Sequence, residues 1–78
     1  NTPISIFPNP AKNQITISSS IYNPVSISII DKVGRIIEKK DCINLVNEVI
    51  DIKNVKSGSY FIEIISDDKK YIKKFVKN

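Results

Sequence analysis

Apolar residues recur at every second position along most of this chain. Residues 25–29 and 60–64 both follow this pattern, which has the period of a half-buried β-strand rather than of a helix. The segment Phe7-Pro8-Asn9-Pro10 adds a second constraint, because each proline fixes its own φ and drives the preceding residue out of the helical region. A strand is therefore expected to end here in a stiff corner, and the chain is expected to be all-β.

Turn signals divide the chain at intervals of roughly 8–12 residues, which is typical of a β-sandwich or a small barrel. We expect an Ig-like antiparallel β-sandwich of about seven strands. The strand that starts near Tyr60 is expected at the centre of a sheet, and the charged fourth strand at a sheet edge. Residues 31–34 and 67–69 are expected to form hairpin turns. The strands are expected near residues 4–7, 14–18, 25–31, 34–40, 47–52, 59–66 and 69–76.

The same alternation predicts which side chains enter the core. The aromatic residues Phe7 and Phe75 are expected to join them, and Val55 to close the core from a short turn that ends at Gly58. The core is predicted to contain Ile6, Ile15, Ile17, Val25, Ile27, Ile29, Ile52, Tyr60, Ile62 and Ile64.

Length and composition limit the class of protein. With 78 residues the chain is expected to be one domain, residues 1–78, of modest stability. The single cysteine, Cys42, excludes an internal disulfide. The net charge of +4 is spread along the sequence and is interpreted as solubilising. No stretch approaches the ~20 apolar residues of a membrane span, and no secretory signal opens the chain, so it is expected to be a piece of a longer protein.

The residues that usually carry out catalysis are scarce. Histidine is absent, so the commonest general base and metal ligand is missing, and Cys42 has no base to activate it. Asp67 and Asp68 are adjacent in an expected hairpin turn, where their side chains point apart and no third oxygen ligand stands nearby. We therefore predict no catalytic residue, no metal and no cofactor.

Binding to nucleic acid is not favoured, because it requires basic residues interleaved with exposed aromatic rings. Tryptophan is absent, and Tyr22 with Tyr71 would make a weak stacking platform. The same shortage argues against a sugar-stacking module. The lysines of residues 69–77 could meet an anionic surface, although a solvated strand face is the favoured interpretation.

Five short segments, in their order and spacing, carry a family resemblance. They are residues 4–10, 27–35, 50–52, 57–60 and 74–77. Together they resemble the type A C-terminal sorting domain of the Bacteroidetes type IX secretion system, also called the Por secretion system. The resemblance covers essentially the whole chain, with Phe7 where the family often has tyrosine and Val55 where it often has leucine. The residues that match the pattern are Pro8, Asn9, Pro10, Gly34, Gly58, Tyr60, Lys74, Phe75, Val76 and Lys77.

The resemblance implies a seven-stranded Ig-like sandwich fused behind a cargo protein. Its implied partners are the outer-membrane secretion machinery and the sortase-like protease of that machinery, which removes the domain in many members. The implied location is the periplasm in transit, followed by surface attachment or release. The alternative is an Ig-like or fibronectin-like adhesion module that binds protein or carbohydrate, and a weak dimer through an exposed strand edge stays open.

Overall fold

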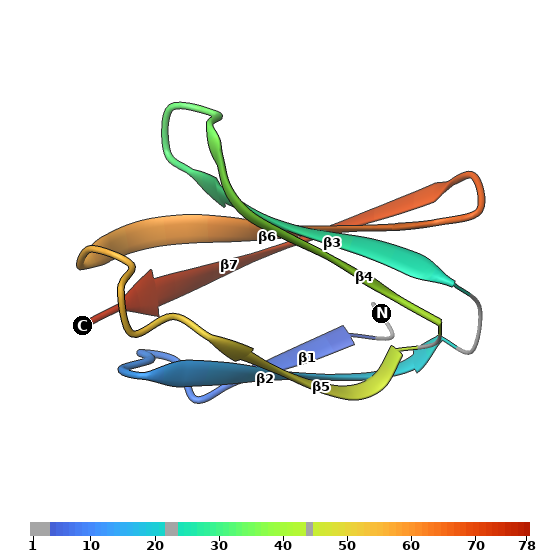
Figure 1. Cartoon of the computed structure of the whole chain (residues 1–78), viewed down its shortest axis with the longest axis horizontal. Helices are drawn as coiled ribbons and strands as arrows, with labels where there is room; N and C mark the ends of the chain where they lie inside the picture. The colour runs from blue at the N-terminus through green and yellow to red at the C-terminus, as the bar shows by residue number, and fades with distance from the viewer. Residues whose placement is uncertain (1–3, 22–23, 44) are drawn as a thin grey trace.

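The computed structural model describes residues 4–21, 24–43 and 45–78, and it confirms the all-β class (Figure 1). β1, β2, β3 and β7 begin at the predicted residues, β6 begins one residue early and β5 two residues early. β4 begins two residues later than predicted because Arg35 still belongs to the preceding turn. The strands are β1 (Ile4–Phe7), β2 (Gln14–Ile21), β3 (Val25–Asp31), β4 (Ile36–Cys42), β5 (Leu45–Asp51), β6 (Gly58–Ser66) and β7 (Lys69–Lys77).

The strands form two antiparallel sheets that face each other across the core (Figure 1). The smaller sheet has the order β1-β2-β5, and the larger has the order β4-β3-β6-β7. β6 therefore lies between two neighbours and β4 lies at an edge, as predicted. The described residues contain no helix that could cross a membrane.

The core is built from the inward positions of both sheets. Nine of the ten predicted core residues are buried, and so is Phe75. Burial of isoleucine side chains from both faces supplies the main stabilising term, at roughly 1.5–3 kcal/mol for each fully buried side chain. The core also contains Ile4, Ala11, Ile21 and Ile50.

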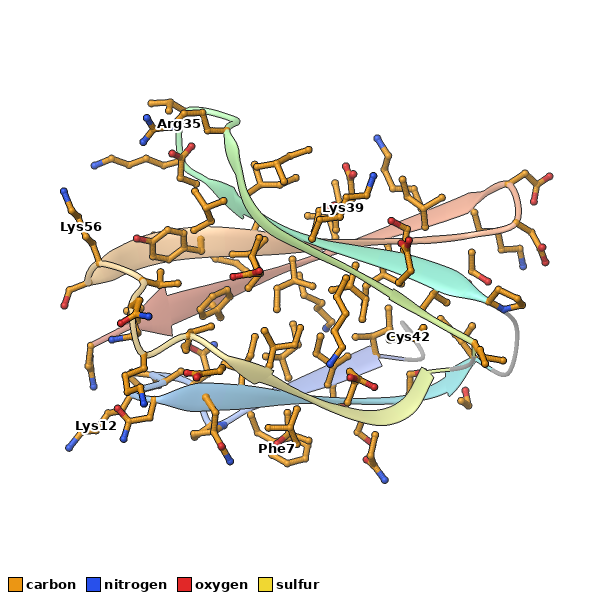
Figure 2. All side chains as sticks on the ribbon, in the orientation of Figure 1. Phe7, Lys12, Arg35, Lys39, Cys42 and Lys56 are labelled. Carbon is orange, nitrogen blue, oxygen red and sulfur yellow. The ribbon has the colours of Figure 1, made fainter. Side chains whose placement is uncertain are left out.

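Two predicted core positions are wrong. Phe7 is 49% exposed and points away from the larger sheet (Figure 2). Since Ile4 is buried, the alternation along β1 places residue 7 on the opposite face. Ile6 is on the inward face but only half-buried, because the four-residue β1 lies at the edge of its sheet.

Two other predictions about single residues can be compared with the structure, and a third cannot. Val55 and Tyr71 are half-buried and pack against the core. Tyr22 lies outside the described residues.

The predicted turn after β3 is held by one aspartate. Asp31 Oδ1 accepts hydrogen bonds from the amides of Val33 (3.1 Å) and Arg35 (2.8 Å). Asp31 Oδ2 accepts a third bond from Arg35 Nε at 2.9 Å. Gly34 has a φ of +94°, a conformation that favours glycine. The last hairpin turns at residues 67–68, where Asp67 has a φ of +55°.

Candidate recognition surface

The structure brings most of the residues that match the family pattern to one end of the sandwich. Pro8, Asn9 and Pro10 form the β1–β2 connection, Gly58 begins β6, and residues 74–77 end β7. Figure 1 shows these segments at the same end as the C-terminus. We call residues 8–11, Gly58, Tyr60 and residues 74–78 the β7 junction.

Hydrogen bonds tie the β1–β2 connection to the end of β7. Asn9 Oδ1 accepts a bond of 3.0 Å from the Val76 amide. The Ala11 amide donates to Val76 O, and Ala11 O accepts from the Asn78 amide, both at 2.8 Å. Ala11 and Lys77 thereby form an isolated parallel bridge. The asparagine thus supplies a hydrogen-bond acceptor that backbone pairing alone would not provide there.

The start of β6 packs against the same part of β7. Tyr60 lies opposite Phe75 in the strand register, and the two rings stack with centroids 5.6 Å apart. The Tyr60 hydroxyl donates a 2.6 Å hydrogen bond to Lys56 O. Since Phe75 is fully buried and Tyr60 nearly so, a partner protein can sense these two residues only through the shape that they maintain.

The two glycines of the pattern occupy different surroundings. Gly58 lies opposite Lys77 and has a φ of +148°, a conformation that side-chain-bearing residues rarely adopt. Gly34 lies in the β3–β4 turn, and a Cβ added there would meet nothing within 4 Å. Gly34 is therefore at the same end of the molecule but is not part of the β7 junction.

The fold concentrates a charge that is dispersed in the sequence. Residues 8–13, 31–35, 51–57 and 77–78 lie together at one end, which we call the turn end (Figure 1). It holds six of the twelve Lys and Arg residues but two of the eight Asp and Glu residues, so the rest of the chain has six of each. Lys12, Arg35 and Lys56 are labelled at this end in Figure 2. The whole net charge of +4 therefore belongs to the turn end.

A groove also opens at the side of the sandwich, between the edge strands β4 and β5. Its volume is about 790 Å³. Its lining mixes apolar residues such as Ile37 and Val55 with charged residues of both signs, such as Arg35 and Asp51. The alternation of apolar residues along single strands did not predict this groove, because the groove depends on how the two sheets are placed relative to each other.

Cys42 lies at the end of β4, far from the turn end (Figure 2). Burial, followed by the nearby Glu48 carboxylate, raises the pKa of the Cys42 thiol, which disfavours the reactive thiolate. Glu48 pairs with Lys40 across the two sheets, and this contact lowers the pKa of Glu48. Among the described residues, no group of His, Cys, Asp or Glu is placed to hold a metal ion.

Comparison with known proteins identifies the family. A family model described as a secretion system C-terminal sorting domain matches residues 5–78. The chain belongs to this family. The resemblance to type IX sorting domains that the five segments predicted is thereby confirmed.

A curated relative shows where such a sorting domain can occur. The chain is 34% identical over 77 residues to an endo-acting ulvan lyase from Formosa agariphila. The aligned region covers 94% of this chain and 14% of the lyase. The sorting domain thus corresponds to a small part of a much longer protein.

A solved structure confirms the predicted fold. A DUF3244 family protein from Bacteroides vulgatus, described as an immunoglobulin-like β-sandwich, superposes with a TM-score of 0.82. The match covers 100% of this chain and 87% of that chain at 22% identity. The similarity establishes the Ig-like β-sandwich predicted from the strand pattern.

Proposed function

We propose that this sorting domain directs a protein attached before residue 1 across the outer membrane through the type IX secretion machinery. A sortase-like protease of that machinery then removes the domain. The attached protein passes through the periplasm and is afterwards released or held at the outer-membrane surface. The domain itself is non-catalytic and acts by being recognised.

The observation that carries this proposal is the β7 junction. Segments 65 or more residues apart in sequence, such as Asn9 and Val76, are joined there by direct hydrogen bonds. β1 begins at the opposite end of the sandwich (Figure 1). A protein attached before β1 would therefore lead away from the junction and leave it accessible.

The relation to the lyase supports the same interpretation. A match limited to 14% of that protein is what an attached module would give, with the catalytic part elsewhere. We propose that Asn9, Lys74, Val76 and Lys77 contribute directly to recognition. Pro8, Pro10, Gly34, Gly58, Tyr60 and Phe75 contribute by holding the chain in shape.

A transplant experiment tests the proposal. Residues 1–78 are fused behind a fluorescent protein that carries a periplasmic signal, in a bacterium with a type IX system. We expect the reporter outside the cell or on its surface, whereas the reporter without the domain stays in the periplasm. Periplasmic retention of the full fusion would overturn the proposal.

A shorter fusion examines the β7 junction itself. Deleting residues 74–78 removes Phe75 from the core and removes the hydrogen-bond partners of Asn9 and Ala11. We expect this fusion to remain in the periplasm. Its thermal unfolding should also occur at a lower temperature than that of the intact fusion, since a buried aromatic ring is lost.

A further inference from the structure

The outer face of the larger sheet carries a continuous set of apolar side chains. Ile30 lies opposite Ile36 on β4 and opposite Phe61 on β6. On these strands the buried residues, such as Ile29 and Ile62, occupy the alternate positions, so the set of three faces away from the core. Cross-strand neighbours on one face are in contact distance, so the three side chains form one row.

β7 extends this row around a lysine. Phe61 lies opposite Lys74. Ile72 and Val76 lie two residues before and after Lys74, and therefore on the same face. We call Ile30, Ile36, Phe61, Ile72 and Val76, with Lys74 among them, the outer patch.

The outer patch is partly exposed, and the described side chains of the smaller sheet form no equivalent. Ile36 is 59% exposed and Ile72 is 55% exposed, while Ile30, Phe61 and Val76 are half-buried. On the smaller sheet the corresponding rows read Ser5–Ser18–Asn47 and Phe7–Thr16–Val49, so hydroxyl and amide groups surround two apolar residues. Contiguous exposed apolar surface with a polar rim is typical of protein interaction sites.

The charge at the outer patch indicates the chemistry of the partner. Lys74 is exposed and forms no ion pair with any residue that the structure describes, whereas Arg35, Lys40 and Lys70 are each paired with a carboxylate. The outer patch also adjoins the turn end, which carries the net positive charge. A complementary surface would place an acidic side chain against Lys74 and apolar groups against its neighbours.

We propose that the outer patch is the docking surface for an acidic, apolar-centred protein surface of the export machinery. This inference rests on the proposed function, because export needs a partner that recognises the folded domain. The partner binds the outer side of β7. Phe75, on the inner side of that strand, packs in the core and holds the strand in place.

A pair of double variants tests the apolar part of the outer patch in the reporter fusion. Ile36→Ser with Ile72→Ser removes two exposed side chains from it. Phe7→Ser with Val49→Ser removes two side chains of similar exposure, 49% and 50%, from the smaller sheet. We expect export to fall about tenfold in the first variant, as for central interface residues, and to stay at the wild-type level in the second.

Charge variants test the role of the lysine. Lys74→Glu should reduce export by a similar factor, and Lys74→Arg should preserve it, since the positive charge remains. Lys69→Glu, which makes the same change at the other end of β7, should leave export unchanged. Thermal unfolding of every variant shows whether a loss of export follows from a loss of folding.

The outcomes separate this inference from the proposed function. If the wild-type fusion is not exported, the proposed function is wrong. If the wild-type fusion and the folded Ile36→Ser, Ile72→Ser variant are exported equally, the outer patch is not the docking surface, although the domain still directs export. Two further experiments test other occupants of the outer patch. Sedimentation measures binding of a second copy of the chain, and a vesicle-binding assay measures binding of a lipid surface. The proposal would be wrong if the chain associates with itself, or binds anionic lipid vesicles, and if the double change Ile36→Ser and Ile72→Ser abolishes that association or binding.

Discussion

The two edge strands of the larger sheet, β4 and β7, are held in opposite ways. β4 has no fully buried side chain, and its register with β3 shifts between Ile29 and Ile30. β7 inserts Phe75 into the core and pairs with Ala11 beyond its own sheet. β4 therefore depends on its turn and on hydrogen bonds, whereas β7 depends on side-chain packing and on a distant segment.

This difference shows what apolar composition does at a sheet edge. Ile36 and Ile37 open β4 but remain exposed, because only one neighbouring strand covers an edge. Charged residues then point inward along β4, as with Lys40 and its partner Glu48, which discourages pairing with other chains. β7 also exposes one isoleucine, Ile72, but it is anchored in the core by the large aromatic ring of Phe75, which stacks on Tyr60.

The sharpest test of this comparison truncates one apolar residue on each edge. Phe75→Ala should lower the free energy of unfolding by ~3–5 kcal/mol, because it empties a fully buried site. Ile36→Ala should change it by less than ~0.5 kcal/mol, as exposed substitutions usually do. Denaturant titration of both variants measures the difference, and equal losses would show that the two edges are held alike.

A smaller effect is expected where β6 begins, opposite the end of β7. Gly58→Val should cost ~1–3 kcal/mol, because a β-branched residue is strained at the observed φ of +148°. Ser57→Ala is the matched control in the preceding turn and should be close to neutral. Thermal unfolding compares them, and equal transition temperatures would mean that the corner tolerates a side chain.

The contribution of the distant segment to β7 can be measured by itself. Asn9→Ala removes the acceptor of the 3.0 Å bond from the Val76 amide and should cost about 1 kcal/mol. Gln14→Ala, an exposed polar change at the start of β2, is the control. Hydrogen exchange at the Val76 amide should be faster in the Asn9 variant, and unchanged exchange would show that the side chain does not protect it.

The smallest effect concerns the turn that leads into β4, and it depends on pH. Hydrogen bonds from the Arg35 amide and side chain and from the Val33 amide hold the pKa of Asp31 below its ordinary value of 3.8. A lowered pKa stabilises the fold above that ordinary value, and the contribution is lost as pH falls through the folded-state pKa. Asp31→Asn should therefore destabilise the protein more at pH 7 than at acid pH.

The matched control for this variant is Asp68→Asn in the other hairpin turn. Urea midpoints measured between pH 7 and about pH 2 compare the two variants. A loss in Asp31→Asn that is the same at both ends of this range would mean that the carboxylate charge does not stabilise the turn.

Much of the fold follows from local pattern. In β6 the alternation of Tyr60, Ile62 and Ile64 predicted both the strand and its inward face. In β1 the same alternation places Phe7 on the outward face, so the expectation that this aromatic residue joins the core was wrong. The two-residue error at β4 reflects a turn whose length is set by the Asp31–Arg35 contact.

The candidate recognition surface was harder to predict from local sequence patterns than the strands were. The family pattern listed Asn9 and Val76, but nothing in the sequence near either residue indicates that they bond to each other. The charge of the turn end was missed for a related reason, since three connections from separate parts of the chain assemble it. The outer patch could be identified only from the register of four neighbouring strands, because the pattern along a single strand does not show which side chains lie next to each other.

The bridge between Ala11 and Lys77 has a consequence for biosynthesis. Ala11 is made before its backbone partners Val76 and Asn78, which lie 65 and 67 residues further along the chain. Contacts of such long sequence separation form slowly, because the entropy of closing the long loop between them must first be overcome. A domain whose synthesis stops before residue 75 therefore lacks both partners of Ala11 and cannot assemble this corner of the sandwich.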